Sequence, residues 1–137
     1  MKYDNPVDVS VKILTSSRNA KDVFDFFLNV KNWESGGIIS SVIKDENDQW
    51  ICDTPAGRAK IICIPDKNCG ILDHTFIVGD VTWNVYVRVI PNNKGSTIVW
   101  TFLKPDALVP EQFYEQLKSF DSEIDGWRRR LENDSRL

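Results

Sequence analysis

Hydrophobic and polar residues alternate along much of this chain with the period of two that is typical of β-strands, and in two segments with the period of a helix. The first strand is predicted over residues 7–15, where Val7, Val9, Val11 and Ile13 alternate with polar residues. This alternation is that of a strand with one buried face. We therefore expect the fold to begin with a half-buried strand.

A helix is predicted next. Asn19 is a good N-cap residue, and the apolar positions that follow it have helical spacing. We expect this helix to end near Asn29 and a short second helix or turn to cover residues 30–35, before the glycine pair at 36–37 stops it. The apolar positions of the first helix are Ala20, Val23, Phe24, Phe27 and Leu28.

A long β region is predicted after these helices. Residues that favour turns, mainly Gly, Pro, Asn and Asp, separate its apolar runs at regular spacing, which is the pattern of consecutive hairpins. We therefore expect an antiparallel meander. Its predicted strands cover residues 38–44, 50–54, 58–63, 70–78, 81–90 and 96–104.

The last predicted element is a long helix that begins near Pro110, a residue suited to the first helical position. Its apolar residues form one continuous stripe over about six turns, and Gly126 interrupts the helix at a cost of about 1 kcal/mol relative to Ala. A stripe of such large side chains needs a large apolar surface, which only the sheet offers. The stripe consists of Phe113, Leu117, Phe120, Ile124, Trp127 and Leu131.

Composition indicates an ordinary globular chain of 137 residues, 42% hydrophobic and 27% charged, for which one domain over residues 1–137 is expected. A net charge of −3 argues against a nucleic-acid partner, because such partners require neutralisation of phosphates. The basic run at 128–130 fits the last turn of a helix, where cations complement the helix dipole. No apolar run reaches the length of a membrane span, and no signal region is seen, so we expect a cytoplasmic protein.

Three cysteines, Cys52, Cys63 and Cys69, form no C-x-x-C motif and are odd in number, so no disulfide framework is expected. A single histidine and scattered cysteines give no zinc signature, and no Gly-rich phosphate loop or nucleophile elbow is present. We therefore expect no metal and no cofactor. Cys52 and Cys63 lie in apolar runs and are interpreted as small buried hydrophobic residues.

The order of the predicted elements, with the long terminal helix last, resembles the helix-grip superfamily of START domains, birch-pollen-allergen-like proteins and polyketide cyclase/dehydrase proteins (SRPBCC). The resemblance covers about residues 7–132. It implies an α+β fold in which a curved antiparallel sheet of about seven strands wraps around the C-terminal helix and encloses a cavity. The polyketide-cyclase-like branch is resembled in particular by Gly70-Ile71-Leu72-Asp73-His74, Val87-Arg88-Val89-Ile90-Pro91-Asn92, Gly95-Ser96, Trp100-Thr101-Phe102 and Val109-Pro110-Glu111-Gln112-Phe113.

Strand alternation then predicts which side chains face that implied cavity, because alternate residues of a strand share one face. On each strand we expect the more apolar set to point inward, together with the stripe of the last helix. Tyr114 is placed either at the cavity mouth or in solvent. The predicted ligand-binding residues are His74, Phe76, Trp83, Val85, Val87, Trp100, Phe102, Phe113, Tyr114, Leu117 and Phe120.

His74 is the only imidazole and the one candidate for catalysis. It could act as a general base or bond a polar ligand group, and the simpler interpretation is a partly buried histidine bonded to a neighbour. Asp73 precedes His74 in the sequence and is expected to point to the opposite face of the strand. Arg88 alternates with apolar neighbours and is expected on the outer face of the sheet.

Three functions are compatible with these predictions. The first is binding of a small hydrophobic molecule, such as a lipid or a polyketide-like compound, in the cavity. The second is a cyclase, dehydratase or hydrolase that uses His74. The third is a protein-interaction domain resembling the co-chaperones of the superfamily. Little catalytic machinery is present, so binding is preferred, and a homodimer is left open.

Overall fold

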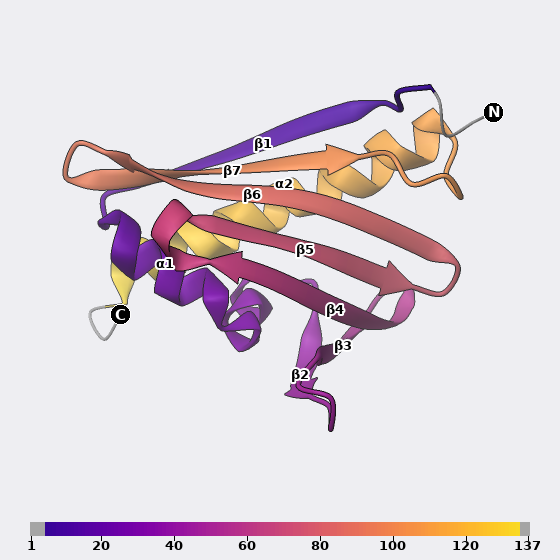
Figure 1. The fold of residues 1–137 in the computed structure, drawn as a ribbon, viewed down its shortest axis with the longest axis horizontal. Helices are drawn as coiled ribbons and strands as arrows, with labels where there is room; N and C mark the ends of the chain where they lie inside the picture. Colours follow the sequence, from indigo (N-terminus) through magenta and orange to yellow (C-terminus); the bar gives the residue numbers. More distant parts are fainter. Residues whose placement is uncertain (1–4, 135–137) are drawn as a thin grey trace.

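The computed structural model describes residues 5–134, and it consists of a bent seven-stranded antiparallel sheet that holds a long helix (Figure 1). The chain builds an edge strand, two helices, six further strands with a short helix between two of them, and the long helix. In chain order the elements are β1 (Val9–Ser16), α1 (Ala20–Leu28), η2 (Val30–Gly36), β2 (Ser40–Lys44), β3 (Trp50–Thr54), β4 (Gly57–Asp66), η3 (Lys67–Cys69), β5 (Ile71–Val78), β6 (Val81–Asn92), β7 (Gly95–Leu103) and α2 (Pro110–Asn133).

The strand order in the sheet is β1-β7-β6-β5-β4-β3-β2, so β2 to β7 form the predicted meander and β1 returns to pair with β7. Figure 1 shows α2 crossing one face of this sheet, with α1 beside its C-terminal end. The predicted helix-grip α+β fold is confirmed. Among residues 5–134, no helix has the length and apolarity needed to cross a membrane.

Several strand boundaries differ from the prediction. β1 begins at Val9 rather than at residue 7, and β4 continues to Asp66, beyond its predicted end at residue 63, because Pro65 and Asp66 still pair with β5. β2 begins at Ser40 rather than at residue 38, because its pairing with β3 shifts register between Ser40 and Ile43 and Ser41 has a φ of 54°. The hairpin between β6 and β7 is tighter than predicted, since pairing continues to Asn92 and resumes at Gly95. Asn93, with a φ of 53°, adopts the left-handed conformation that such a short turn needs.

The burial predicted for β1 is wrong. The three residues Val9, Val11 and Ile13 are 49%, 51% and 56% exposed and lie on the outer face. The inner face at the start of this edge strand meets the polar flank of α2, where Lys12 Nζ lies 2.8 Å from an Asp121 carboxylate oxygen. Polar residues therefore occupy the inner face at the start of β1. Leu14 provides the main buried apolar contact of this strand.

The stripe on α2 is buried as predicted, but Gly126 has a role that helix propensity does not describe. A Cβ added at Gly126 would lie 2.4 Å from the carbonyl oxygen of Ser35 and 3.0 Å from Cα of Gly36. The backbone of η2 therefore packs directly on α2, and Gly126 permits this close approach.

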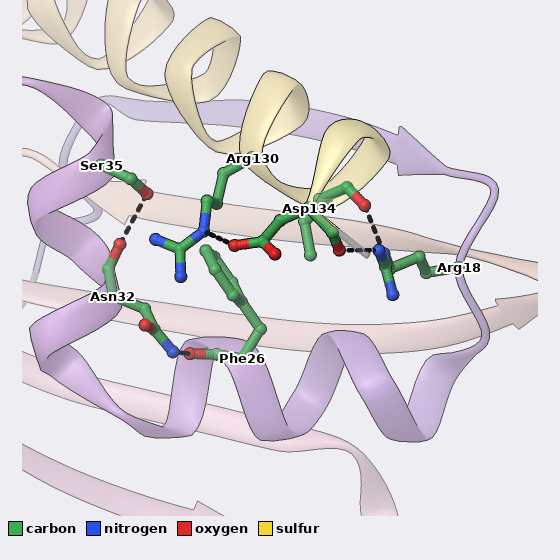
Figure 2. Close-up of polar contacts among 7 residues, drawn as sticks. Arg18, Phe26, Asn32, Ser35, Arg130 and Asp134 are labelled. Carbon is green, nitrogen blue, oxygen red and sulfur yellow. Dashed lines mark hydrogen bonds and ion pairs between the residues drawn. The ribbon is translucent and has the colours of Figure 1, made fainter. Parts of the chain in front are cut away.

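Arg18 fixes the C-terminal end of α2 (Figure 2). Its guanidinium donates to the carbonyl oxygens of Leu131 and Asp134, which the end of the helix leaves without intrahelical partners. Arg130 Nε donates to Asp134 Oδ2 at 2.7 Å, and its guanidinium lies 5.8 Å from the ring centre of Phe26 on α1. The end of α2 is thus tied to α1 and to the segment between β1 and α1.

Replacing Arg18 by Met is expected to lower the free energy of unfolding by about 1–3 kcal/mol, because the partly buried helix end loses charged hydrogen-bond donors. Arg129→Met is the matched control, since Arg129 is exposed near the same helix end. Urea unfolding of both variants measures the difference. Equal stabilities would show that Arg18 does not fix the helix end.

Candidate ligand-binding interior

The side chains of β5, β6 and β7 that strand alternation predicted to point inward do lie on the inner face of the sheet. His74 on β5 is aligned with Val85 on β6, and Val85 with Phe102 on β7, so all three occupy one row across the sheet. Phe76 and Trp83 form the next row, and Val87 and Trp100 lie one row to the other side. No bulge interrupts these pairs, so alternate residues stay on the same face. All of these side chains are buried except Phe76, which is half-buried.

Aromatic rings from the sheet and from α2 fill the space between them at β6 and β7. Trp83 stacks on Phe113 with ring centres 5.8 Å apart, and Trp100 stacks on Trp127 at 5.6 Å. We call this group the aromatic cluster, and it consists of Phe27, Trp83, Trp100, Phe102, Phe113, Phe120 and Trp127. Several of the predicted lining residues therefore pack mainly against one another, as a core does.

Tyr114 and Arg88 both lie away from this interior. Tyr114 is 48% exposed, and its hydroxyl is 3.5 Å from the Asp8 carboxylate on the surface. Arg88 alternates with Val87 and Val89 on β6 and occupies the outer face. Tyr114, one residue beyond the buried Phe113, faces solvent because it falls outside the apolar stripe of α2.

The aromatic cluster does not cover the inner face at β4 and β5. Cys63 is aligned with His74 there, and Val78 lies on the same inner face further along β5. Cys63, Phe76 and Val78 remain half-buried although they point toward the helix side of the sheet. These three residues pack against a second hydrophobic cluster, built from η2 and strands β2 to β4, and still keep part of their surface exposed.

His74 presents one free nitrogen to this part of the interior. Its Nδ1 is 3.1 Å from the carbonyl oxygen of Leu72, which can only accept, so Nδ1 has the proton and Nε2 has the lone pair. Nε2 has no hydrogen-bond partner within residues 5–134. Burial lowers the pKa of His74 to about 4, although the bond to Leu72 raises it slightly, so the ring is neutral at pH 7. The indole of Trp33 lies against it, with ring centres 4.9 Å apart.

Glu123 on α2 is a second titratable group at this interior, and sequence reasoning missed it. Burial raises the pKa of Glu123 to about 8, and no hydrogen bond or ion pair to its carboxyl occurs within residues 5–134. Its Cβ lies 3.0 Å from the position that a Cβ on Gly36 would take, so η2 passes directly beside it. A signal was present in the sequence, because residue 123 is three positions after Phe120 and four before Trp127, next to the apolar stripe.

Asp73 does not assist His74. Its Oδ1 accepts a hydrogen bond from the backbone N–H of Val87 at 2.8 Å, so the carboxylate supports strand pairing instead. Burial raises the pKa of the Cys52 and Cys63 thiols to about 11, which makes both poor nucleophiles at neutral pH. Within the described part of the chain, no group of three His, Cys, Asp or Glu side chains is placed to hold a metal ion.

Two surface pockets occur at opposite ends of the sheet, and neither includes a predicted ligand-binding residue. The first, of about 330 Å³, lies between α1, η3 and the end of β6, and its charged lining residues are Lys21, Lys67 and Arg88. The two lysines share the carboxylate of Asp25, at 3.1 and 3.3 Å. The second, of about 340 Å³, is lined by the β5–β6 turn and the segment between β7 and α2.

Comparison with known proteins identifies the fold. No protein-family model and no curated protein sequence matches the chain. Zhui aromatase/cyclase from Streptomyces sp. R1128 has a TM-score of 0.71 at 11% identity, over 94% of this chain and 98% of that one. Ara h 8.0201 has a TM-score of 0.70 at 14% identity, over 91% and 97%. A START superfamily protein from Mycobacterium smegmatis has a TM-score of 0.64 at 12% identity, over 90% and 98%.

These structures share with the chain the sheet that grips a long C-terminal helix, over nearly the full length of each protein. Identities of 10–14% establish the architecture and leave the activity to be argued from the residues. The chain therefore has the helix-grip fold of the START, Ara h 8 and aromatase/cyclase structures.

Proposed function

We propose that this protein binds a small hydrophobic molecule between α2, η2 and the β4–β5 part of the sheet. The main support is that the inner-face residues Cys63, Phe76 and Val78 remain half-buried beside the sealed aromatic cluster. Apolar side chains that point inward and yet keep exposed surface favour an apolar ligand, because covering them removes that surface from water.

The polar groups of this site fit recognition better than catalysis. His74 lacks the carboxylate partner that would orient a general base, and the thiols nearby are protonated at neutral pH. His74 and Glu123 give the apolar surface two polar positions, which is the usual composition of a small-molecule site. A ligand-binding protein is therefore preferred over the cyclase, dehydratase or hydrolase alternative.

The test uses the fluorescent apolar probe N-phenyl-1-naphthylamine and two variants on adjacent residues of β4. Cys63→Phe adds a ring to the inner face, and Ile64→Phe adds one to the outer face, where Ile64 is 65% exposed. We expect Cys63→Phe to weaken probe binding at least tenfold, because the ring occupies the site, and Ile64→Phe to bind as the wild type does.

The thermal midpoint of each variant confirms that it is folded, and Val78→Phe is a second inner-face variant in case Cys63→Phe is overpacked. Equal probe affinity in the wild type and in both inner-face variants would contradict the proposed location. Absence of probe binding to the wild type would contradict the proposed function.

A further inference from the structure

The polar groups that face the proposed site offer only hydrogen-bond acceptors once Glu123 is ionised. His74 Nε2 has a lone pair, because Nδ1 donates to Leu72. Glu123, when ionised, has only acceptor oxygens. The nearby indole donors are already engaged, since Trp33 Nε1 donates to the carbonyl of Phe27 at 2.9 Å and Trp127 Nε1 to that of Trp33 at 3.1 Å.

Trp33 connects the two acceptors in space. Its ring lies against His74, and its carbonyl oxygen accepts from Trp127, which is one helical turn after Glu123. The ring of Phe120, one turn before Glu123, packs 5.2 Å from that of Trp127. Aromatic residues therefore lie one turn before and one turn after Glu123 on α2.

Among residues 5–134, no cationic side chain pairs with Glu123. On η2, Glu34 is bonded to Lys31 at 2.8 Å and to the backbone N–H of Val42. On β3, burial, then Asp53 and then Glu123 raise the pKa of the Cys52 thiol, so this thiol lies near Glu123 and is neutral. On β1, Lys12 pairs with Asp121 on the opposite flank of α2. On β5 the facing group is the neutral ring of His74.

We propose that the site binds a hydrophobic amine, with the ligand ammonium paired to the Glu123 carboxylate among the faces of Trp33, Phe120 and Trp127. This inference rests on the proposed function and specifies the ligand class for the same site. Aromatic faces attract a desolvated cation, and the half-buried Glu123 carboxyl, which has no partner among residues 5–134, is the complementary anion when ionised. A free carboxylic acid is disfavoured as ligand, because the site offers it no cation.

Binding of the amine changes the protonation state of the protein. The free protein has a protonated Glu123 at neutral pH, so pairing with an ammonium ion releases one proton from the carboxyl to solvent. Since burial raises the pKa of Glu123 to about 8, amine affinity should rise up to tenfold per pH unit from pH 6 to pH 8 and then level off. The affinity of an uncharged ligand should stay constant over this range.

The test uses three ligands with the same ring system, namely 2-(1-naphthyl)ethylamine, 2-(1-naphthyl)ethanol and 1-naphthylacetic acid. Isothermal titration of the wild type at pH 7.5, in two buffers of different ionisation enthalpy, gives affinities and proton release. We expect the amine to bind at least tenfold more tightly than the alcohol, with release of about three-quarters of a proton, and the acid to bind most weakly.

Glu123→Gln should reduce amine affinity to that of the alcohol and abolish proton release, while alcohol affinity stays within twofold of wild type. Glu115→Gln is the matched control on the same helix, because Glu115 is exposed and pairs only with Lys118. Binding of alcohol and amine with equal affinity, or an unchanged preference in Glu123→Gln, would overturn the amine inference and leave the proposed function supported. Failure of all three ligands to bind would contradict the proposed function as well.

Discussion

The free energy of unfolding is expected to fall by about 1 kcal/mol as the pH rises from 6.5 to 8. Burial raises the pKa of Glu123 to about 8 in the folded protein, whereas an unfolded chain has a glutamate pKa near the ordinary value of about 4.3. The folded state therefore binds this proton more tightly, so the stabilisation is complete below about pH 4.3 and disappears as the pH rises through 8.

His74 has the opposite effect at lower pH. Burial lowers its pKa to about 4 in the folded state, against about 6.5 when unfolded, so its contribution is present above pH 6.5 and is lost as the pH falls to 4. The two slopes cancel between about pH 4.5 and 6.5. We therefore expect a plateau of stability there and a decline only above it.

Glu123→Gln tests this assignment, because an amide of nearly the same shape does not titrate. Urea unfolding of the variant between pH 6.5 and 8 should give a constant free energy of unfolding, with a greater stability than wild type at pH 8. Glu115→Gln should keep the wild-type decline. A decline that persists in Glu123→Gln would show that another group is responsible.

The second large effect is expected for Gly126→Ala, which should lower the free energy of unfolding by about 2 kcal/mol. Helix propensity alone predicts a gain of about 1 kcal/mol from the same change. The added Cβ would lie 2.4 Å from the Ser35 carbonyl oxygen, and backbone atoms on both sides leave little room for adjustment. The expected loss arises because η2 must move away from α2.

Ser122→Ala provides the control, because Ser122 is exposed on the same helix and lacks such a contact. It should stabilise the protein by about 0.5 kcal/mol through propensity alone. Thermal and urea unfolding of the two variants compare the effects directly. A Gly126→Ala protein that is as stable as Ser122→Ala would show that η2 does not pack tightly on α2.

The sheet and the long helix could be predicted because their patterns are repeated over many residues. The stripe of α2 and the inner faces of β5, β6 and β7 each follow one period without interruption, so burial of most of their apolar positions was correct. In β1 the alternation of apolar and polar residues correctly predicted a strand. Its apolar side chains were expected to point inward, and they point outward. Which face of an edge strand points inward depends on the surface opposite it, here the polar flank of α2 at Asp121.

The candidate site was predicted less completely than the fold. His74 and Phe76 lie on one strand, and alternation placed them on the inner face. Trp33 and Glu123 reach the same interior from separate elements, through the packing of η2 on α2 that Gly36 and Gly126 permit. Such contacts join residues far apart in sequence, and no local period indicates them. Glu123 was missed since a glutamate beside an apolar stripe is usually solvated.

The most direct test of the account is to locate a bound ligand by NMR. An apolar probe could also bind the exposed outer face of β1, where Val9, Val11 and Ile13 lie. Titration of ¹⁵N-labelled protein with 2-(1-naphthyl)ethanol should shift the indole N–H signal of Trp33 and the backbone amides of Cys63, His74 and Phe76. Shifts confined to the outer face of β1 would contradict an interior binding site.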